Sequence, residues 1–181
     1  MDETMDNQQA KAEFDMGWLV GFIEGEGCFH LARQQYKRQK PTLRPQFSVA
    51  GTDFELIERA GSIIKSLGVG TLYVRKRPSR INDERKKDQL EVAVIGMKRC
   101  VKLLPQIIPY MTLSRKRKAA EKLLEFCEHR LSMPHGTPYG AKEFSFAQSM
   151  RDLNGYKLSQ SLRDSTLGVF AENTKVESSA A

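Results

Sequence analysis

Two acidic residues at the end of one amphipathic segment carry the strongest chemical signal in this sequence. Apolar residues recur at three and four positions between Phe14 and Glu24, which predicts a helix. Gly25 and Gly27 are expected to end it. Glu24 and Glu26 then lie at the C-terminal end, where the helix dipole disfavours a carboxylate by about 0.3–1 kcal/mol. Two acids at such a place are either simply exposed to solvent or neutralised by a cation.

The glycines of the same segment indicate helix pairing. Gly21 and Gly25 are four residues apart, so they share one face of the helix and let a second helix approach closely. Residues 19–27 read Leu-Val-Gly-Phe-Ile-Glu-Gly-Glu-Gly, which closely resembles the motif that names the LAGLIDADG homing endonuclease family. Val20 stands where Ala is usual. The resemblance covers roughly residues 14–131, including the order of the elements.

The resemblance implies a homodimer and a metal site. Because the motif occurs once, its helix is expected to pair with the same helix of a second, identical subunit. The expected interface residues are Trp18, Gly21, Phe22, Glu24 and Gly25. By the same resemblance, Glu26 matches the metal-binding acid of the family and the backbone carbonyl of Gly25 matches a second ligand. Such oxygen ligands suit Mg²⁺. Glu24 matches a position tied to helix-end packing more than to the metal.

Two further catalytic roles are implied by the family. A basic residue lies near the scissile phosphate, in the loop before the last core helix, and that loop is residues 112–118 here. We predict Lys116 first and Arg115 second for this role; the alternative is a basic helix start that contacts only backbone phosphate. A polar residue after the second strand often organises water. Thr52 or Asp53 occupies that place, and the family's Gln is absent from it.

Hydrophobic periodicity predicts the elements that must position these residues. Strands are expected at residues 28–36, 46–50, 70–77 and 90–95, and helices at 54–67, 100–108 and 115–131 in addition to 14–24. A weaker helical pattern covers 141–153. The order α-β-β-α-β-β-α-α predicts an α+β fold, with an antiparallel sheet and helices on one face. The resemblance implies an αββαββα core with a saddle-shaped sheet and extra C-terminal helices.

One face of the predicted sheet is polar and basic. The period of two turns Phe29, Leu31, Phe47, Val49, Leu72 and Val74 inward. The predicted DNA-binding residues, on the opposite face or in the connection after the first strand, are His30, Gln34, Tyr36, Lys37, Arg38, Arg44, Gln46, Ser48, Tyr73, Arg75 and Arg77. Phosphate contacts are expected from Arg33, Lys37, Arg38 and Lys40. The resemblance puts this face on duplex DNA, where Arg reads guanine and Gln reads adenine; the alternative is a plain solvated face.

Composition narrows the class of protein and its partners. The 181 residues include 29 Lys and Arg against 22 Asp and Glu, so the net charge of +7 favours a polyanionic partner. Three widely separated cysteines fit free thiols in a reducing compartment. No apolar run is long enough for a membrane span. We therefore expect a soluble intracellular protein without a membrane partner, in the cytoplasm or in an organelle with its own DNA.

The domain organisation is expected to be simple. We predict a flexible N-terminal tail over residues 1–12 and an endonuclease core over residues 13–131. A helical extension of the same domain is expected over residues 132–170, followed by a flexible tail over residues 171–181.

Three functions are compatible with these patterns. The first is a homodimeric, Mg²⁺-dependent endonuclease that cuts a long, nearly palindromic DNA site and is encoded in a mobile intron. The second is a maturase of the same fold that binds its intron RNA and helps it to splice. The third is a DNA-binding regulator without catalysis, which would have no need for Glu26 and Gly25.

Overall fold

The computed structural model describes residues 3–34, 41–78 and 87–155. The helices are α1 (Glu3–Glu26), α2 (Phe54–Ile64), α3 (Met97–Ile107), α4 (Ser114–Ser132) and α5 (Ala141–Leu153). The strands are β1 (Gly27–Gln34), β2 (Thr42–Gly51), β3 (Tyr73–Arg77) and β4 (Gln89–Ile95). A π-helical turn, η1 (Lys65–Val69), follows α2, and a 3₁₀ turn, η2 (Ile108–Tyr110), follows α3. The predicted α+β fold and order of elements are confirmed.

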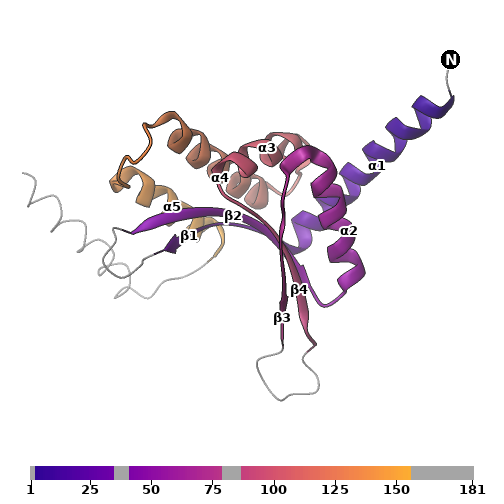
Figure 1. Ribbon diagram of the computed structural model, residues 1–181, viewed down its shortest axis with the longest axis horizontal. Coiled ribbons are helices and arrows are strands. Elements are labelled where there is room, and N and C mark those ends of the chain that lie inside the picture. Colours follow the sequence, from indigo (N-terminus) through magenta and orange to yellow (C-terminus); the bar gives the residue numbers. More distant parts are fainter. Residues whose placement is uncertain (1–2, 35–40, 79–86, 156–181) are drawn as a thin grey trace, which may run out of the picture.

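The four strands form one antiparallel sheet in the order β1-β2-β4-β3. β1 and β3 are therefore its edges. Figure 1 shows the helices on one side of a strongly twisted sheet, with the β3–β4 hairpin projecting beyond them.

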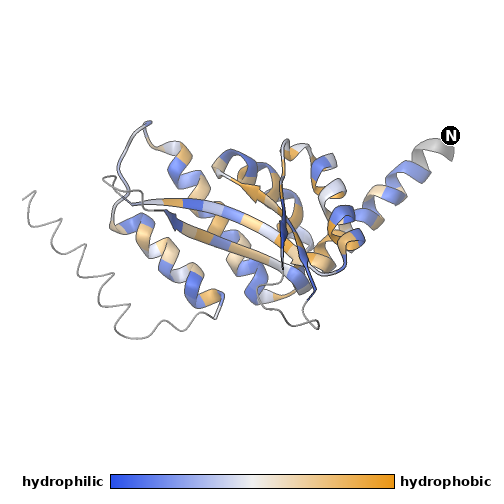
Figure 2. Ribbon diagram, turned by 60° about the horizontal axis from the view of Figure 1, so that its bottom comes forward, coloured by the Kyte–Doolittle hydropathy of each residue, from blue (hydrophilic) through white to orange (hydrophobic). Residues whose placement is uncertain are grey.

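Alternate residues of the strands supply the core on the helix side. Phe29 and Phe47 are directly opposite each other in the register and their rings stack at 5.0 Å between centroids. Val49 and Val94 lie beside them and are completely buried. The helices contribute Ile57, Leu103, Leu104, Leu123 and Phe126 to the same cluster. In Figure 2 the hydrophobic segments gather where strands and helices face one another, whereas β3 and the N-terminal half of α1 are hydrophilic.

Helix α1 begins at Glu3, well before the predicted start at Phe14. Residues 3–12, which were expected to form a flexible tail, are helical. These residues are polar and, from residue 7 onwards, exposed, so no apolar stripe indicated their helical state. The expected end of the helix is nearly right, because β1 starts directly after Glu26.

Strand β2 begins at Thr42, whereas the predicted strand starts only at residue 46. Proline has no N–H to donate and is therefore rare inside a central strand. Pairing between β2 and β4 stops at Gln46, however, so Pro45 lies beyond that ladder. Its carbonyl accepts a hydrogen bond from the Gly96 N–H at 3.0 Å.

Strand β3 corrects another prediction. Val74 shares the inward parity of Val92, its partner in the register, yet it is 60% exposed. The hairpin projects past the helices, and of the described contacts with this side of β3 the one made by a helix is that of Phe54, at the start of α2, with Lys76. None of the helices in the described ranges is long and apolar enough to span a bilayer.

Candidate functional site

The site is built where α1 meets β1. Gly27 is buried, and a Cβ placed there would lie 2.5 Å from the carbonyl oxygen of Ile23. Only glycine fits this close passage from helix to strand. Gly25 and Glu26 precede it and are both exposed, and no described residue hydrogen-bonds to the Glu26 carboxylate. The turn therefore presents a free acid and the last turn of the helix, whose carbonyl oxygens have no partner within the helix.

Glu24 has a different environment from Glu26. Its Oε1 accepts from the backbone N–H groups of Thr112 and Leu113 at 2.5 and 2.6 Å, and its Oε2 accepts from the Thr112 hydroxyl at 2.8 Å. Desolvation raises the pKa of Glu24, but these hydrogen bonds and the charge of Lys116 outweigh it, so the pKa is lowered. The carboxylate thus fastens the segment before α4 to the end of α1. Its oxygens are used within the chain, which leaves Glu26 as the acid available for a ligand.

The first turn of α4 brings two basic residues to this place. The Lys116 ammonium donates to the carbonyl oxygen of Gly27, next to Glu26. The Arg115 guanidinium turns the other way, donating to the carbonyl of Leu153 and packing against Gly155 at the end of α5. Lys116 therefore lies at the turn between α1 and β1 that carries Glu26 (the acidic turn), whereas Arg115 caps the end of α5.

The available ligands at this turn suit a hard divalent cation. One carboxylate and nearby backbone carbonyls are oxygen donors, which Mg²⁺ and Ca²⁺ prefer over nitrogen or sulfur. No group of three or more His, Cys, Asp or Glu side chains that could hold a metal occurs within the described ranges. A divalent cation held at this turn would take only part of its ligands from one chain.

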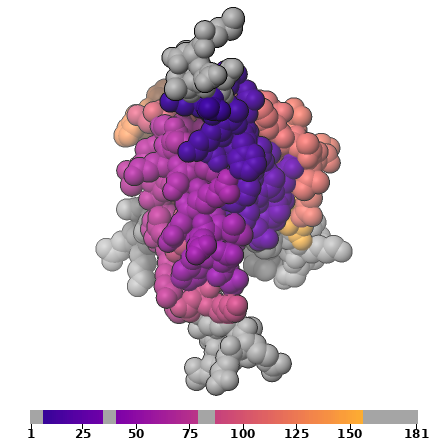
Figure 3. Space-filling view, turned by 90° about the vertical axis from the view of Figure 1, so that its right-hand side faces the viewer, coloured from indigo at the N-terminus to yellow at the C-terminus, as the bar shows by residue number. Residues whose placement is uncertain are grey.

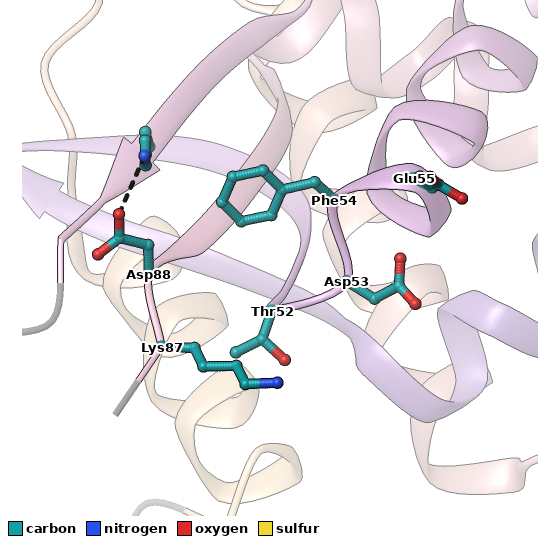
Figure 4. Close-up of a pocket in the computed structure, with 7 residues that line it drawn as sticks. Thr52, Asp53, Phe54, Glu55, Lys87 and Asp88 are labelled. Carbon is teal, nitrogen blue, oxygen red and sulfur yellow. Dashed lines mark ion pairs between the residues drawn. The ribbon is translucent and has the colours of Figure 1, made fainter. Parts of the chain in front are cut away.

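Thr52 lies in a separate pocket. Figure 4 shows Thr52 and Asp53 beside Lys87 and Asp88, at the end of β2. Asp53 caps α2 by accepting from the N–H of Leu56 at 3.3 Å. The pocket that contains Lys116 is lined by other residues, including Gly27 and Leu113. Among the described contacts, none joins Thr52 to Glu26, so its predicted role with water remains a prediction.

The register confirms that the predicted outward residues share one face of the sheet. His30 pairs with Gln46, Ala32 with Arg44, and Gln34 with Thr42. On the other half, Tyr73 pairs with Ala93, and Ser48 with the same Ala93. Arg33 has the opposite parity and lies over the ring of Phe144 at 5.9 Å, away from that face. Tyr36, Lys37, Arg38 and Lys40 lie outside the described residues.

Exposure differs strongly across this face. Tyr73, Arg75 and Arg77 on the edge strand β3 are exposed. Gln46 and Ser48 are only 8% and 7% exposed, because β2 is a central strand with β1 on one side and β4 on the other. Burial lowers the pKa of His30, against the opposing charge of Glu91, so its ring is neutral at pH 7. The edge strand thus offers the most accessible donors for a partner.

Two residues of the site were missed by sequence reasoning. Glu91 faces the same way as Arg75, its register partner, and binds both Arg75 and Arg77. The period of two already turned it outward, since Leu90 and Val92 point inward. Asn154 donates to the carbonyl of Phe29 at 2.7 Å and so covers the free edge of β1. No local pattern indicated that contact.

The outer face of α1 is open. A Cβ added at Gly17, Gly21 or Gly25 would meet nothing within 4 Å. These glycines are four residues apart, so they form one stripe. Figure 3 shows α1 in indigo as a broad exposed surface beside α2 in magenta. Of the predicted interface residues, Gly21 and Gly25 lie in this stripe and Trp18 and Phe22 lie beside it. Glu24 is bonded instead to the segment before α4.

Trp18 and Phe22 form the flank of the stripe. Their rings stack at 5.2 Å between centroids, and both are partly buried against the core. The guanidinium of Arg59 lies 4.3 Å from the centroid of Trp18 and so covers part of it within the same chain. Trp18 therefore packs on its own subunit first, and only its remaining surface is available to a partner.

Comparison with known proteins places these features in a family. A family model described as LAGLIDADG endonuclease matches residues 19–127. The fold is similar to that of the homing endonuclease I-CvuI in complex with its target in the presence of Ca, at 19% identity and a TM-score of 0.56 over 83% of this chain and 87% of that one. Among curated protein sequences, none matches this chain.

Two further solved structures share the fold. The archaeal intron-encoded homing endonuclease I-Vdi141I, complexed with DNA, has 18% identity and a TM-score of 0.59 over 82% of this chain and 89% of that one. The homing endonuclease I-LtrWI, bound to target DNA, has 18% identity and a TM-score of 0.61 over 85% of this chain but only 49% of that one. The present chain therefore corresponds to about half of the second protein.

Proposed function

Because this chain belongs to the LAGLIDADG endonuclease family and is a DNA-cleaving hydrolase, we propose that it is a site-specific homing enzyme that cuts both strands of a long, nearly palindromic duplex as a homodimer. The observation that carries the proposal is the turn between α1 and β1. There the free Glu26 carboxylate lies beside Gly27, whose carbonyl holds the Lys116 ammonium. A free carboxylate next to a held ammonium group at one helix end suits metal-dependent phosphodiester hydrolysis.

The residues of this turn have separate roles in the proposed reaction. Glu26 and the carbonyl of Gly25 would hold Mg²⁺, which when bound activates water and neutralises charge on the phosphate. The Lys116 ammonium keeps hydrogens beyond the one given to Gly27, and these can stabilise the negative charge that develops on a phosphate oxygen. Glu24 holds the Thr112–Leu113 segment and thereby fixes the start of α4 that carries Lys116.

The homodimer is supported by the open glycine stripe of α1. Gly17, Gly21 and Gly25 leave room for a second helix at close range. Pairing α1 with its copy would bring two Glu26 turns together, one for each strand of a duplex. I-LtrWI, of which this chain matches 49%, is about twice as long as the matched part, which fits a chain that supplies one half of such an enzyme.

The DNA substrate and the intron origin are supported by the solved relatives. I-CvuI has been crystallised with its target and Ca, and with the I-CreI target and Mg, where the DNA was not cleaved. I-Vdi141I is intron-encoded. We propose the same partner, a divalent cation and a mobile-intron origin for the present chain, with the open sheet face on the duplex.

Replacement of Glu26 by Gln tests this function. We expect E26Q to lose Mg²⁺-dependent cleavage of a duplex recovered from a randomised library, since the amide cannot provide the charge that holds the cation. Binding to the same duplex, measured with EDTA present, should persist, because removal of a negative charge does not weaken attraction to phosphates.

The matched control is Glu58→Gln, which removes an exposed acid from α2 and should keep both activities. If E26Q cuts DNA as fast as the unmodified protein, the proposed metal site is wrong. If the unmodified protein binds duplex DNA but never cuts it with Mg²⁺, the proposed function itself is wrong.

A further inference from the structure

A buried acid lies on the sheet face that we propose for DNA. Glu91 is 3% exposed and sits in the middle of β4, directly opposite Arg75 in the register. A carboxylate on this surface repels phosphates, and burying a carboxylate is costly unless it is paired. Its position therefore needs a reason beyond packing.

The contacts of Glu91 supply that reason. Arg75 Nη2 lies 3.0 Å from Oε2, Arg77 Nε lies 3.0 Å from the same oxygen, and Arg77 Nη2 lies 2.6 Å from Oε1. Arg77 is thus held through its Nε–Nη2 edge, and Arg75 through one nitrogen. The two arginine side chains remain 46% and 44% exposed, so one side of each guanidinium is fixed while the other faces outward.

Fixing these arginines matters because β3 is an exposed edge strand. A free arginine loses much rotational freedom when it binds, whereas one already held in place loses little. The bond to Glu91 also leaves Arg77 only its Nη1–Nη2 edge for a ligand. That edge can donate two parallel hydrogen bonds to O6 and N7 of guanine.

The charge of Glu91 acts on all DNA sequences alike. It offsets part of the positive charge of Arg75 and Arg77, and phosphate attraction is the main source of non-specific binding. An arginine pair that is held in place and partly neutralised therefore binds phosphates less tightly. It binds more tightly to a base that lies at the right position.

We propose that Glu91 is a specificity-determining positioning residue, which holds Arg75 and Arg77 in one arrangement for base recognition and weakens binding to unrelated DNA. The proposal rests on the proposed function, because it requires the open sheet face to contact a duplex. Its ligand is a base pair of the target with a guanine edge in the major groove.

The test compares Glu91→Gln with Asp88→Asn. Asp88 pairs with Lys76 at 3.0 Å just before the same strand, and its side chain is 41% exposed, so D88N removes a nearby charge while Glu91 still holds Arg75 and Arg77. A preferred duplex is first selected by binding from a randomised library, and its Kd is compared with that of an unrelated duplex at several salt concentrations.

We expect E91Q to bind the unrelated duplex more tightly. The Kd for the unrelated duplex divided by the Kd for the preferred duplex should fall about tenfold. D88N should tighten both duplexes equally and leave that ratio unchanged. Arg77→Lys keeps the charge but cannot be held through two nitrogens, so it should also lower the ratio, and E91Q should add nothing further to it. If thermal unfolding shows that E91Q folds poorly, Arg77→Lys still tests whether the fixed arrangement of Arg77 sets the ratio.

An unchanged ratio in folded E91Q, or an equal loss in D88N, overturns the role of Glu91 and leaves the proposed function intact. Failure of the proposed function would look different. If the unmodified protein prefers no duplex in the selection, the proposal that this sheet face recognises DNA is wrong.

Discussion

Lys116 and Arg115 are neighbours in the chain but have different partners. Lys116 donates to Gly27 beside the acidic turn, and Arg115 donates to Leu153 at the end of α5. We predict that Lys116→Met lowers the rate of single-turnover DNA cleavage by about 100-fold, because a donor to the developing phosphate charge is lost. Its melting temperature should hardly change. Arg115→Met should keep most of the rate and lower the free energy of unfolding by about 1 kcal/mol, since a helix end loses its cap.

Cleavage kinetics and thermal unfolding of both variants check this division. Should Arg115→Met lose the rate at full stability while Lys116→Met keeps it, the two roles are exchanged, and the second choice made from the sequence is the correct one.

Single residues show how far the sequence could predict the site. The motif identified Glu26, Gly25 and the α1–β1 turn, because their spacing is local. The partner of Glu24 lies 88 residues away in the chain, at Thr112, so only the folded structure reveals it. Glu91 could have been placed on the outward face by alternation, but its pairing with Arg75 depends on the register between β3 and β4.

At the scale of elements, α5 is fixed to α4 by one buried acid. Glu143 has a side chain that is only 4% exposed, and it accepts from Arg130 and His129 of α4, each at 3.1 Å. The Gly140 N–H also donates to it at 2.9 Å. Burial raises the pKa of Glu143, but the hydrogen bonds outweigh this, and the pKa is lowered from its ordinary value of 4.5.

Glu143→Gln should therefore lower the free energy of unfolding by about 3 kcal/mol near neutral pH, because Arg130 is left buried without its counter-charge. A carboxyl with a lowered folded pKa stabilises the protein above its unfolded pKa, and this contribution is lost as pH falls through the folded value. The difference between E143Q and the unmodified protein should accordingly shrink below pH 4.5.

Denaturant unfolding at several pH values measures this difference. Glu121→Gln is the matched control on α4, since its pair with Arg117 is about half exposed and should contribute about 0.3–0.5 kcal/mol at most. A loss in E143Q as small as in E121Q would contradict the role assigned to the buried pair.

The elements also show why sequence patterns succeed or fail. The weak helical pattern at residues 141–153 predicted α5 with its observed bounds, because Glu143, Phe146 and Met150 recur on one buried face. The start of α1 was missed, since residues 3–12 carry no apolar stripe. The start of β2 was missed because Pro45 is tolerated only where β4 no longer pairs with that strand.

At the scale of the whole molecule, the sequence predicted the fold class and the polar face of the sheet, but not how that face is divided. Strand parity is local, so the outward residues that lie in the described strands share one face, as predicted. Exposure depends on the neighbouring strands: Arg75 and Arg77 are accessible on the edge strand, and Gln46 is nearly buried on a central one. The face therefore offers its donors mainly through the β3–β4 hairpin, which projects beyond the helices (Figure 1).

The assembly proposed for the enzyme makes opposite predictions for stability and for activity at Gly21. A Cβ at Gly21 would have no atom of another part of the chain within 4 Å, so a leucine side chain there starts into open space, and leucine favours a helix over glycine by about 1 kcal/mol. Gly21→Leu should thus unfold at the same or a higher temperature. The added side chain would nevertheless keep two copies of α1 apart, so the variant should be a monomer in analytical ultracentrifugation and fail to cut both strands.

Ser149→Leu, at an exposed position of α5, controls for added apolar surface and should remain an active dimer. A G21L variant that is dimeric and cuts both strands would show that the subunits meet elsewhere than the glycine stripe of α1.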